Sequence, residues 1–166
     1  MRDDAPAAEL ARLNVFVYGT LKRGQRNHER FCGNLASVQE AIVRGRLYEL
    51  PYGFPGLVVP EADMLSAGTT DYLADTETGH SKKVGPLEKP LGPTVRGELL
   101  TFDDPEKRLP ALDDLEGFRP GEKSLYERVL IPVTLSETGA AIPAWTYVVE
   151  EPSSGLYLPD GYWPAP

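Results

Sequence analysis

Two short segments of this 166-residue chain share one pattern, with a glycine in the middle of an expected strand. Residues Val43–Leu47 read Val-Arg-Gly-Arg-Leu, and residues Val95–Leu99 read Val-Arg-Gly-Glu-Leu. Glycine inside a strand normally weakens a sheet, so its presence marks a sharp bend or the close approach of another backbone. Two such strands predict a curved or closed sheet. A match over five residues is too short to define a repeat.

Runs of apolar residues predict the remaining elements of the sheet. Glycine at 139 suits a hairpin loop between the last two expected strands. A short helical turn is expected at 27–31. We expect strands over 14–18, 38–50, 126–135 and 142–149.

A longer helix is predicted before residue 117. Asp104 is a candidate N-cap and Pro105 a candidate first helical residue, while Gly117 is a natural C-cap. Leucines recur at every third position over 109–115, as on one helix face. Because Pro110 interrupts this pattern, the helix begins either at Pro105 or at Pro110.

Three segments lack the periodic spacing of apolar residues that marks an element packed on a core. Residues 1–12 read as a flexible polar arm, and 63–93 read as a segment without regular structure that is either a functional lid or a mobile insertion. The tail over 152–166 is too rich in proline for regular structure, although its aromatic residues can seal one mouth of the sheet. Residues 13–163, with the segment 63–93 included, are expected to form a single domain.

Composition excludes several classes of protein. The net charge of −8 and the pI of about 4.8 argue against a nucleic-acid binder, which normally has a basic face. No apolar run approaches the length of about 20 residues that spans a bilayer. Two histidines and the single Cys32 argue against a protein-ligated zinc or iron site, so we expect no metal and no cofactor. An acidic N-terminus and a lone cysteine indicate a cytoplasmic protein.

The segment Val15–Gly24 joins the first predicted strand to a loop. Four apolar or aromatic residues run into Gly19 and Thr20, and two cations and a second glycine follow. A strand that ends in this way leaves backbone N–H groups unpaired at its C-terminal edge. Such groups suit a carboxylate, a phosphate or an oxyanion. The loop therefore predicts an anionic ligand, without naming a reaction.

Three acids lie at the end of the predicted helix, at Asp113, Asp114 and Glu116. Mutual repulsion and partial burial would raise the pKa of at least one of these carboxyl groups toward neutrality. A carboxyl group with a pKa of about 6–7 both accepts and donates a proton at working pH. The alternative reading of these residues is a solvated acidic helix face.

Tyr126 and Arg128 are the third chemistry-bearing feature. In a strand they point to the same face, with Glu127 on the other. A phenol beside a guanidinium can orient a substrate or a catalytic acid. The alternatives are a surface pair between strands and, for Arg128, a structural partner of Asp113 or Asp114.

These segments, in this order, resemble the γ-glutamylcyclotransferase superfamily, and more narrowly its branch of AIG2-like proteins and γ-glutamylamine cyclotransferases. Members share a Tyr-Gly-Thr/Ser-Leu loop continued as Lys-x-Gly-x-x-Asn, which is matched in full by Tyr18–Asn27. They also share an acidic helix end with a glutamate and a Tyr-x-Arg strand, here Asp113–Gly117 and Tyr126–Arg128. A later strand contributes an aromatic residue, matched by Tyr147. The segment 63–93 looks like an insertion relative to a typical member.

The resemblance implies an α+β fold, a small mixed β-barrel with short flanking helices, and a pocket between the loop and Glu116. Family members release 5-oxoproline from γ-glutamyl compounds, so it implies a small γ-glutamyl substrate and a catalytic Glu116 acting as general acid and base. Lys22 and Arg23 either draw an anionic substrate or lie in solvent. The implied substrate-binding residues are Tyr18, Gly19, Thr20, Leu21, Tyr126, Arg128 and Tyr147. The competing hypothesis is a non-catalytic module that binds a small metabolite on the same barrel.

Overall fold

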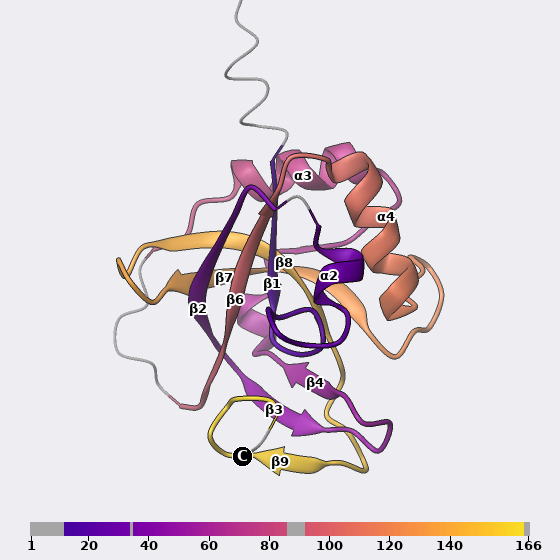
Figure 1. Cartoon of the computed structure of the whole chain (residues 1–166), viewed down its shortest axis with the longest axis vertical. Helices are drawn as coiled ribbons and strands as arrows, with labels where there is room; N and C mark the ends of the chain where they lie inside the picture. Colours follow the sequence, from indigo (N-terminus) through magenta and orange to yellow (C-terminus); the bar gives the residue numbers. More distant parts are fainter. Residues whose placement is uncertain (1–11, 34, 86–91, 165–166) are drawn as a thin grey trace, which may run out of the picture.

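The computed structural model describes residues 12–33, 35–85 and 92–164, which form the strands and helices shown in Figure 1. The predicted arm at 1–12 falls outside this range except for its last residue. The strands are β1 (Leu13–Val17), β2 (Ser37–Arg44), β3 (Arg46–Glu49), β4 (Pro55–Val58), β5 (Ser66–Ala67), β6 (Thr94–Phe102), β7 (Glu127–Leu135), β8 (Ala141–Val148) and β9 (Leu156–Leu158). The helices are α2 (His28–Phe31), α3 (Tyr72–Ser81) and α4 (Pro105–Glu116), with a 3₁₀ turn, η1, at Glu61–Asp63.

Five strands form a closed mixed barrel, which confirms the expected α+β fold. The order is β2-β6-β1-β8-β7, and the pairing of β7 with β2 closes the barrel. The strands β1 and β8 run parallel, whereas the other neighbours in the barrel are antiparallel. A three-stranded sheet, β4-β3-β9, lies at one end of the barrel, at the bottom of Figure 1.

Both mid-strand glycines have the steric role that the sequence predicts. Gly45 has a φ of +153°, and here the expected strand 38–50 breaks into β2 of the barrel and β3 of the smaller sheet. Gly97 lies in β6 against β1, where an added Cβ atom would come 2.2 Å from the Val17 carbonyl oxygen. No side chain fits at position 97 unless β1 and β6 move apart.

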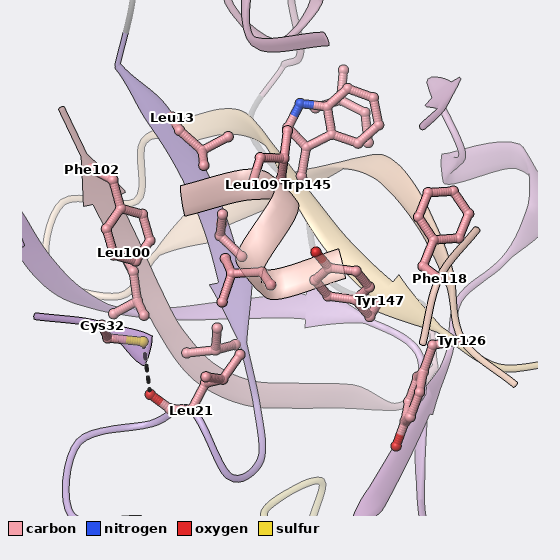
Figure 2. Packing of buried hydrophobic residues seen from close by; sticks show 14 of the residues in the cluster. Leu13, Leu21, Cys32, Leu100, Phe102, Leu109, Phe118, Tyr126, Trp145 and Tyr147 are labelled. Atoms are coloured by element: carbon pink, nitrogen blue, oxygen red, sulfur yellow. Dashed lines mark hydrogen bonds between the residues drawn. The ribbon is translucent and has the colours of Figure 1, made fainter. Parts of the chain in front are cut away.

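The two central strands β1 and β8 are buried on both faces. Phe16 and Ala144 point into the barrel, while Val15, Val17 and Trp145 point outward toward the helices. The outer cluster is covered by α4, and Figure 2 shows Leu109 of α4 among side chains of the sheet. Because β1 and β8 are held from both sides, the loop that leaves β1 begins from a rigid base.

The long helix begins at Pro105 and ends at Glu116, so the later start at Pro110 is wrong. Pro110 lies inside the helix, where it has no backbone N–H to donate. Gly117 adopts the left-handed conformation with a φ of +72°, as expected of a C-cap. The Phe118 N–H donates to the Asp113 carbonyl and closes the end of the helix.

The prediction that 63–93 lacks regular structure is wrong for its described part. This part contains β5, which pairs with β7, and the ten-residue α3. Asp71 caps α3 by accepting a hydrogen bond from the Ala74 N–H, and the buried side chains of α3 are Asp75 and Thr76. Because α3 is anchored through polar groups, it has no apolar period that the sequence can reveal. Residues 86–91 lie outside the described residues.

The tail also forms more structure than expected. β9 pairs with β3 despite the nearby prolines. Trp163 is buried in the cluster inside the barrel and donates its indole N–H to Glu49 at 2.7 Å. The expectation that a tail aromatic seals one mouth of the sheet is confirmed.

The contact at Gly97 predicts a large loss of stability on adding one methyl group. We expect Gly97→Ala to lower the free energy of unfolding by at least about 2 kcal/mol, because the new Cβ atom overlaps the β1 backbone. Gly85→Ala is the matched control, since no atom lies within 4 Å of its added Cβ. Denaturant titration of both variants measures the difference, and equal stability would contradict the close packing of β1 and β6.

Candidate active site

A cavity of about 270 Å³ opens where the loop after β1 faces the C-terminal end of α4. The sequence predicts a pocket between these two elements, and the cavity lies there. Its aromatic and apolar walls come from the loop, β4, α4 and the start of β7. It is lined by Phe16, Val17, Tyr18, Gly19, Thr20, Leu21, Arg26, Asn27, Phe54, Pro55, Leu115, Glu116, Leu125, Tyr126 and Tyr147.

The loop after β1 presents backbone N–H groups to this cavity. Within the described residues, the amides of Gly19, Thr20 and Leu21 donate no hydrogen bond. Asn27 folds the loop back on itself, because its side chain donates to the Thr20 hydroxyl at 2.9 Å and its N–H to the Thr20 carbonyl at 3.0 Å. A Cβ atom at position 19 would come 2.7 Å from the Pro55 side chain. The loop is therefore tightly held, with donors left for a ligand.

Glu116 is the last residue of α4, and its carboxyl group lines the same cavity. The side chain is half-buried, and no cation among the described residues forms an ion pair with it. Burial without a compensating partner raises the pKa of Glu116 from 4.5 to about 7. Such a group is close to half-ionised at neutral pH, which is what proton transfer in both directions requires.

Three tyrosines form walls of the cavity, and each hydroxyl already has an acceptor. Tyr18 donates to the Tyr147 carbonyl at 2.6 Å, Tyr126 donates to the Pro55 carbonyl at 2.5 Å, and Tyr147 donates to Asp113 at 2.6 Å. Burial, and also the nearby charge of Glu116, raises the pKa of all three phenols. They stay protonated and fixed in orientation, so they shape the cavity rather than donate to an anion in it.

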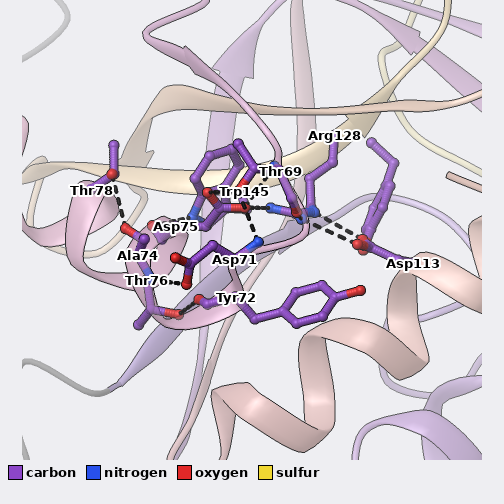
Figure 3. A network of polar contacts seen from close by, with 11 residues as sticks. Thr69, Asp71, Tyr72, Ala74, Asp75, Thr76, Thr78, Asp113, Arg128 and Trp145 are labelled. Atoms are coloured by element: carbon purple, nitrogen blue, oxygen red, sulfur yellow. Dashed lines mark hydrogen bonds and ion pairs between the residues drawn. The ribbon is translucent and has the colours of Figure 1, made fainter. Parts of the chain in front are cut away.

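Arg128 lies behind the cavity and does not line it, which corrects its expected place in the substrate pocket. Its guanidinium is fully buried and binds Asp113 through two N–H groups, at 2.8 and 3.1 Å. It also donates to Asp75 at 3.0 Å and to the Thr69 carbonyl at 2.9 Å, as Figure 3 shows. Of the alternatives raised by the sequence, the structural partner of Asp113 is the one observed.

Lys22 and Arg23 are the two loop cations that could attract an anionic substrate, but both are engaged in contacts within the protein. Lys22 is buried; it donates to the Trp163 carbonyl, and its ammonium lies 3.6 Å from the centre of the Tyr162 ring. Lys22 therefore ties the loop to the C-terminal tail. Arg23 is half-exposed, and its side chain pairs with that of Glu98 at 2.9 Å.

Sequence reasoning did not select Arg26 or Leu125, which the structure places in the cavity lining. Arg26 occupies an unspecified position of the loop motif, so the motif gives no signal for it. Phe54, which lies just before β4, also lines the cavity. The predicted residues Tyr18, Gly19, Thr20, Leu21, Glu116, Tyr126 and Tyr147 do meet in one cavity.

The two residue types most associated with metal binding have other roles here. His28 Nδ1 lies 2.8 Å from the Leu21 carbonyl oxygen, and Cys32 is buried in the outer cluster. Residues 12–33, 35–85 and 92–164 contain no group of three or more His, Cys, Asp or Glu side chains placed to hold a metal ion. Across these same residues, every helix is too short or too polar to cross a membrane.

Comparisons with known proteins identify a family for this chain. The model of the family described as "Gamma-glutamyl cyclotransferase, AIG2-like" matches residues 15–78 and 82–165. Within the segment 63–93, the match leaves out residues 79–81.

A curated relative, the γ-L-glutamyl-butirosin B γ-glutamyl cyclotransferase of Niallia circulans, is 29% identical over 137 residues. These residues are 81% of this chain, and the match spans 65% of the length of the relative.

Two solved structures share the fold. An AIG2-like protein from Mus musculus has a TM-score of 0.54 at 24% identity, with 83% of this chain and 77% of that chain covered. The protein YkqA from Bacillus subtilis has a TM-score of 0.55 at 18% identity, with 92% and 39% covered.

The buried network predicts unequal effects of two arginine substitutions. We expect Arg128→Met to lower the free energy of unfolding by about 3–5 kcal/mol, because Asp113 and Asp75 lose their buried cation. Arg23→Met, which breaks the more exposed pair with Glu98, should cost at most about 1 kcal/mol. Thermal or denaturant unfolding measures both, and similar losses would show that Arg128 does not anchor α4.

Proposed function

The chain belongs to the AIG2-like γ-glutamyl cyclotransferase family, and on that premise we propose that it releases 5-oxoproline from a γ-glutamyl-amine or a γ-glutamyl-amino acid. In this reaction the α-amine of the substrate attacks its own γ-carbonyl carbon. A five-membered ring closes, the γ-amide bond breaks, and the amine portion leaves. The cavity has room for a small substrate folded toward ring closure. Well-oriented intramolecular attack supplies about 7–11 kcal/mol of the barrier.

Proton transfers must accompany ring closure, and we assign them to Glu116. The α-amine is bound as an ammonium; it loses one proton before it attacks and a second one as the ring N–H forms. The leaving nitrogen gains one proton as the amide bond breaks, and the released amine takes up the second to become an ammonium. A carboxyl group with a pKa of about 7 accepts protons from the α-nitrogen and delivers them to the leaving nitrogen. This unpaired, half-buried carboxyl group is the observation that carries the proposal.

The loop amides are the proposed anchor for the glutamyl end of the substrate. The three phenol hydroxyls already donate to protein acceptors, whereas the amides of Gly19, Thr20 and Leu21 have no acceptor among the described residues. They are suited to the α-carboxylate or to the oxyanion that forms on the γ-carbonyl oxygen. Tyr18, Tyr126 and Tyr147 enclose the bound group.

The competing function is a module that binds a small metabolite without turnover. Glu116 favours the enzyme, because an unpaired carboxylate in a half-buried position costs stability without a structural gain. A protein that only binds has no need of a proton carrier with a pKa of about 7. Turnover of γ-glutamyl compounds separates the two functions.

Replacement of Glu116 tests the mechanism. We expect Glu116→Gln to lower kcat/KM for 5-oxoproline release by about 10²–10⁴-fold, the usual contribution of a general acid–base group. The wild-type kcat/KM should fall below an apparent pKa of about 7, because the protonated carboxyl group cannot accept the ammonium proton. Release of 5-oxoproline from a panel of γ-glutamyl compounds, followed from pH 5 to 9, measures both effects.

A stability measurement separates loss of chemistry from loss of folding. The folded-state pKa of Glu116 lies above its unfolded value, so its ionisation lowers the stability of the wild type as the pH rises from about 4.5 to about 7. Glu116→Gln should therefore be at least as stable as the wild type at pH 8. Turnover that survives in this folded variant would overturn the role of Glu116.

A further inference from the structure

The charged groups of the cavity suggest how the enzyme recognises the leaving amine. Among the described residues that line the cavity, Glu116 is the one acid and Arg26 the one cation. The two form no ion pair with each other. Together with the loop amides, the cavity therefore contains two sites for anionic groups and one for an ammonium.

These two anion sites lie at different depths. Gly19 and Leu21 are buried, whereas the Arg26 side chain is exposed at the rim. The rim also contains Leu125, which is 49% exposed, and Phe54, whose ring lies 6.1 Å from that of Tyr126. The glutamyl end must reach Glu116 and the amides, so the leaving portion of the substrate extends toward Arg26.

Arg26 also differs from the other two cations of its loop. Lys22 is engaged with the tail, and Arg23 is engaged with Glu98. Arg26 has no ion-pair partner in the described part of the chain. The backbone around it is held, because the N–H groups of the two residues that follow donate to the carbonyls of Thr20 and Gln25. The backbone at Arg26 is therefore held in place, while its guanidinium is available to bind a ligand.

We propose that Arg26 is a specificity-determining residue that selects γ-glutamyl substrates whose leaving amine carries a carboxylate. The inference rests on the proposed function and narrows its substrate class to γ-glutamyl-amino acids. Such a substrate has two carboxylates and one ammonium, which match the two anion sites and Glu116. A guanidinium binds a carboxylate through two parallel hydrogen bonds, and a simple γ-glutamyl-amine offers it no such partner. The apolar rim accommodates the side chain of the leaving amino acid.

A matched pair of substrates tests this inference. γ-L-Glutamyl-L-phenylalanine and γ-L-glutamyl-2-phenylethylamine differ only in the carboxylate of the leaving group. We expect the wild type to prefer the first by at least about tenfold in kcat/KM at pH 8. Arg26→Gln should bring the two values within about threefold, mainly by slowing the first substrate. Arg26→Lys should retain part of the preference, because lysine keeps the positive charge but lacks the two parallel N–H donors of the guanidinium.

Arg30→Gln is the control for long-range charge effects. Arg30 is exposed four residues away, is not part of the cavity lining, and its removal changes the net charge equally. The control should keep the wild-type preference. A wild type without preference, or an Arg26→Gln variant that loses both substrates equally, would overturn the inference.

Binding measurements distinguish this inference from the proposed function. The affinities of both compounds for the wild type and for Arg26→Gln are measured by calorimetry. If neither compound yields 5-oxoproline, the proposed function fails for these two substrates. The role of Arg26 is then judged from the measured affinities alone. A carboxylate preference in Kd that Arg26→Gln abolishes would support the role, and equal affinities in the wild type would refute it.

Discussion

The ion pair between Arg128 and Asp113 is the interaction on which the candidate site depends. It joins β7 to the end of α4 through two hydrogen bonds in a fully buried position. Glu116 lies three residues after Asp113, on the same side of the helix. Fixing Asp113 therefore fixes the direction in which Glu116 enters the cavity. The hydroxyl of Tyr147 also binds Asp113, so a wall of the cavity shares this anchor.

The arrangement combines one well-paired charge cluster with one unpaired acid. Asp75 and Asp113 share the guanidinium of Arg128, and their burial is compensated. Glu116, one helical turn away, has no such partner, and its pKa is raised to about 7. The rigid strands β1 and β8 and the paired cluster hold this unfavourable group in place. This is the expected relation between a stable scaffold and a destabilised functional residue.

Local steric rules and a recognisable motif made much of the structure predictable. The roles of Gly45 and Gly97, the capped end of α4 and the meeting of the loop with Glu116 all follow from the sequence. Helix α3 does not, because its anchor is an ion pair between Asp75 and a residue 53 positions away. The burial of Arg128 behind the cavity and the exposed position of Arg26 at its rim depend on contacts between distant parts of the chain. Such contacts leave no periodic pattern in the sequence.

The central claim is that one cavity holds the glutamyl end at the loop amides and its α-amine at Glu116. A crystal structure of Glu116→Gln with an uncleaved γ-glutamyl substrate tests it most directly. The account predicts the α-nitrogen within hydrogen-bond reach of the residue 116 side chain and an anionic oxygen facing the amides of Gly19–Leu21. A substrate bound outside this cavity, or bound with its α-amine turned away from residue 116, would contradict it.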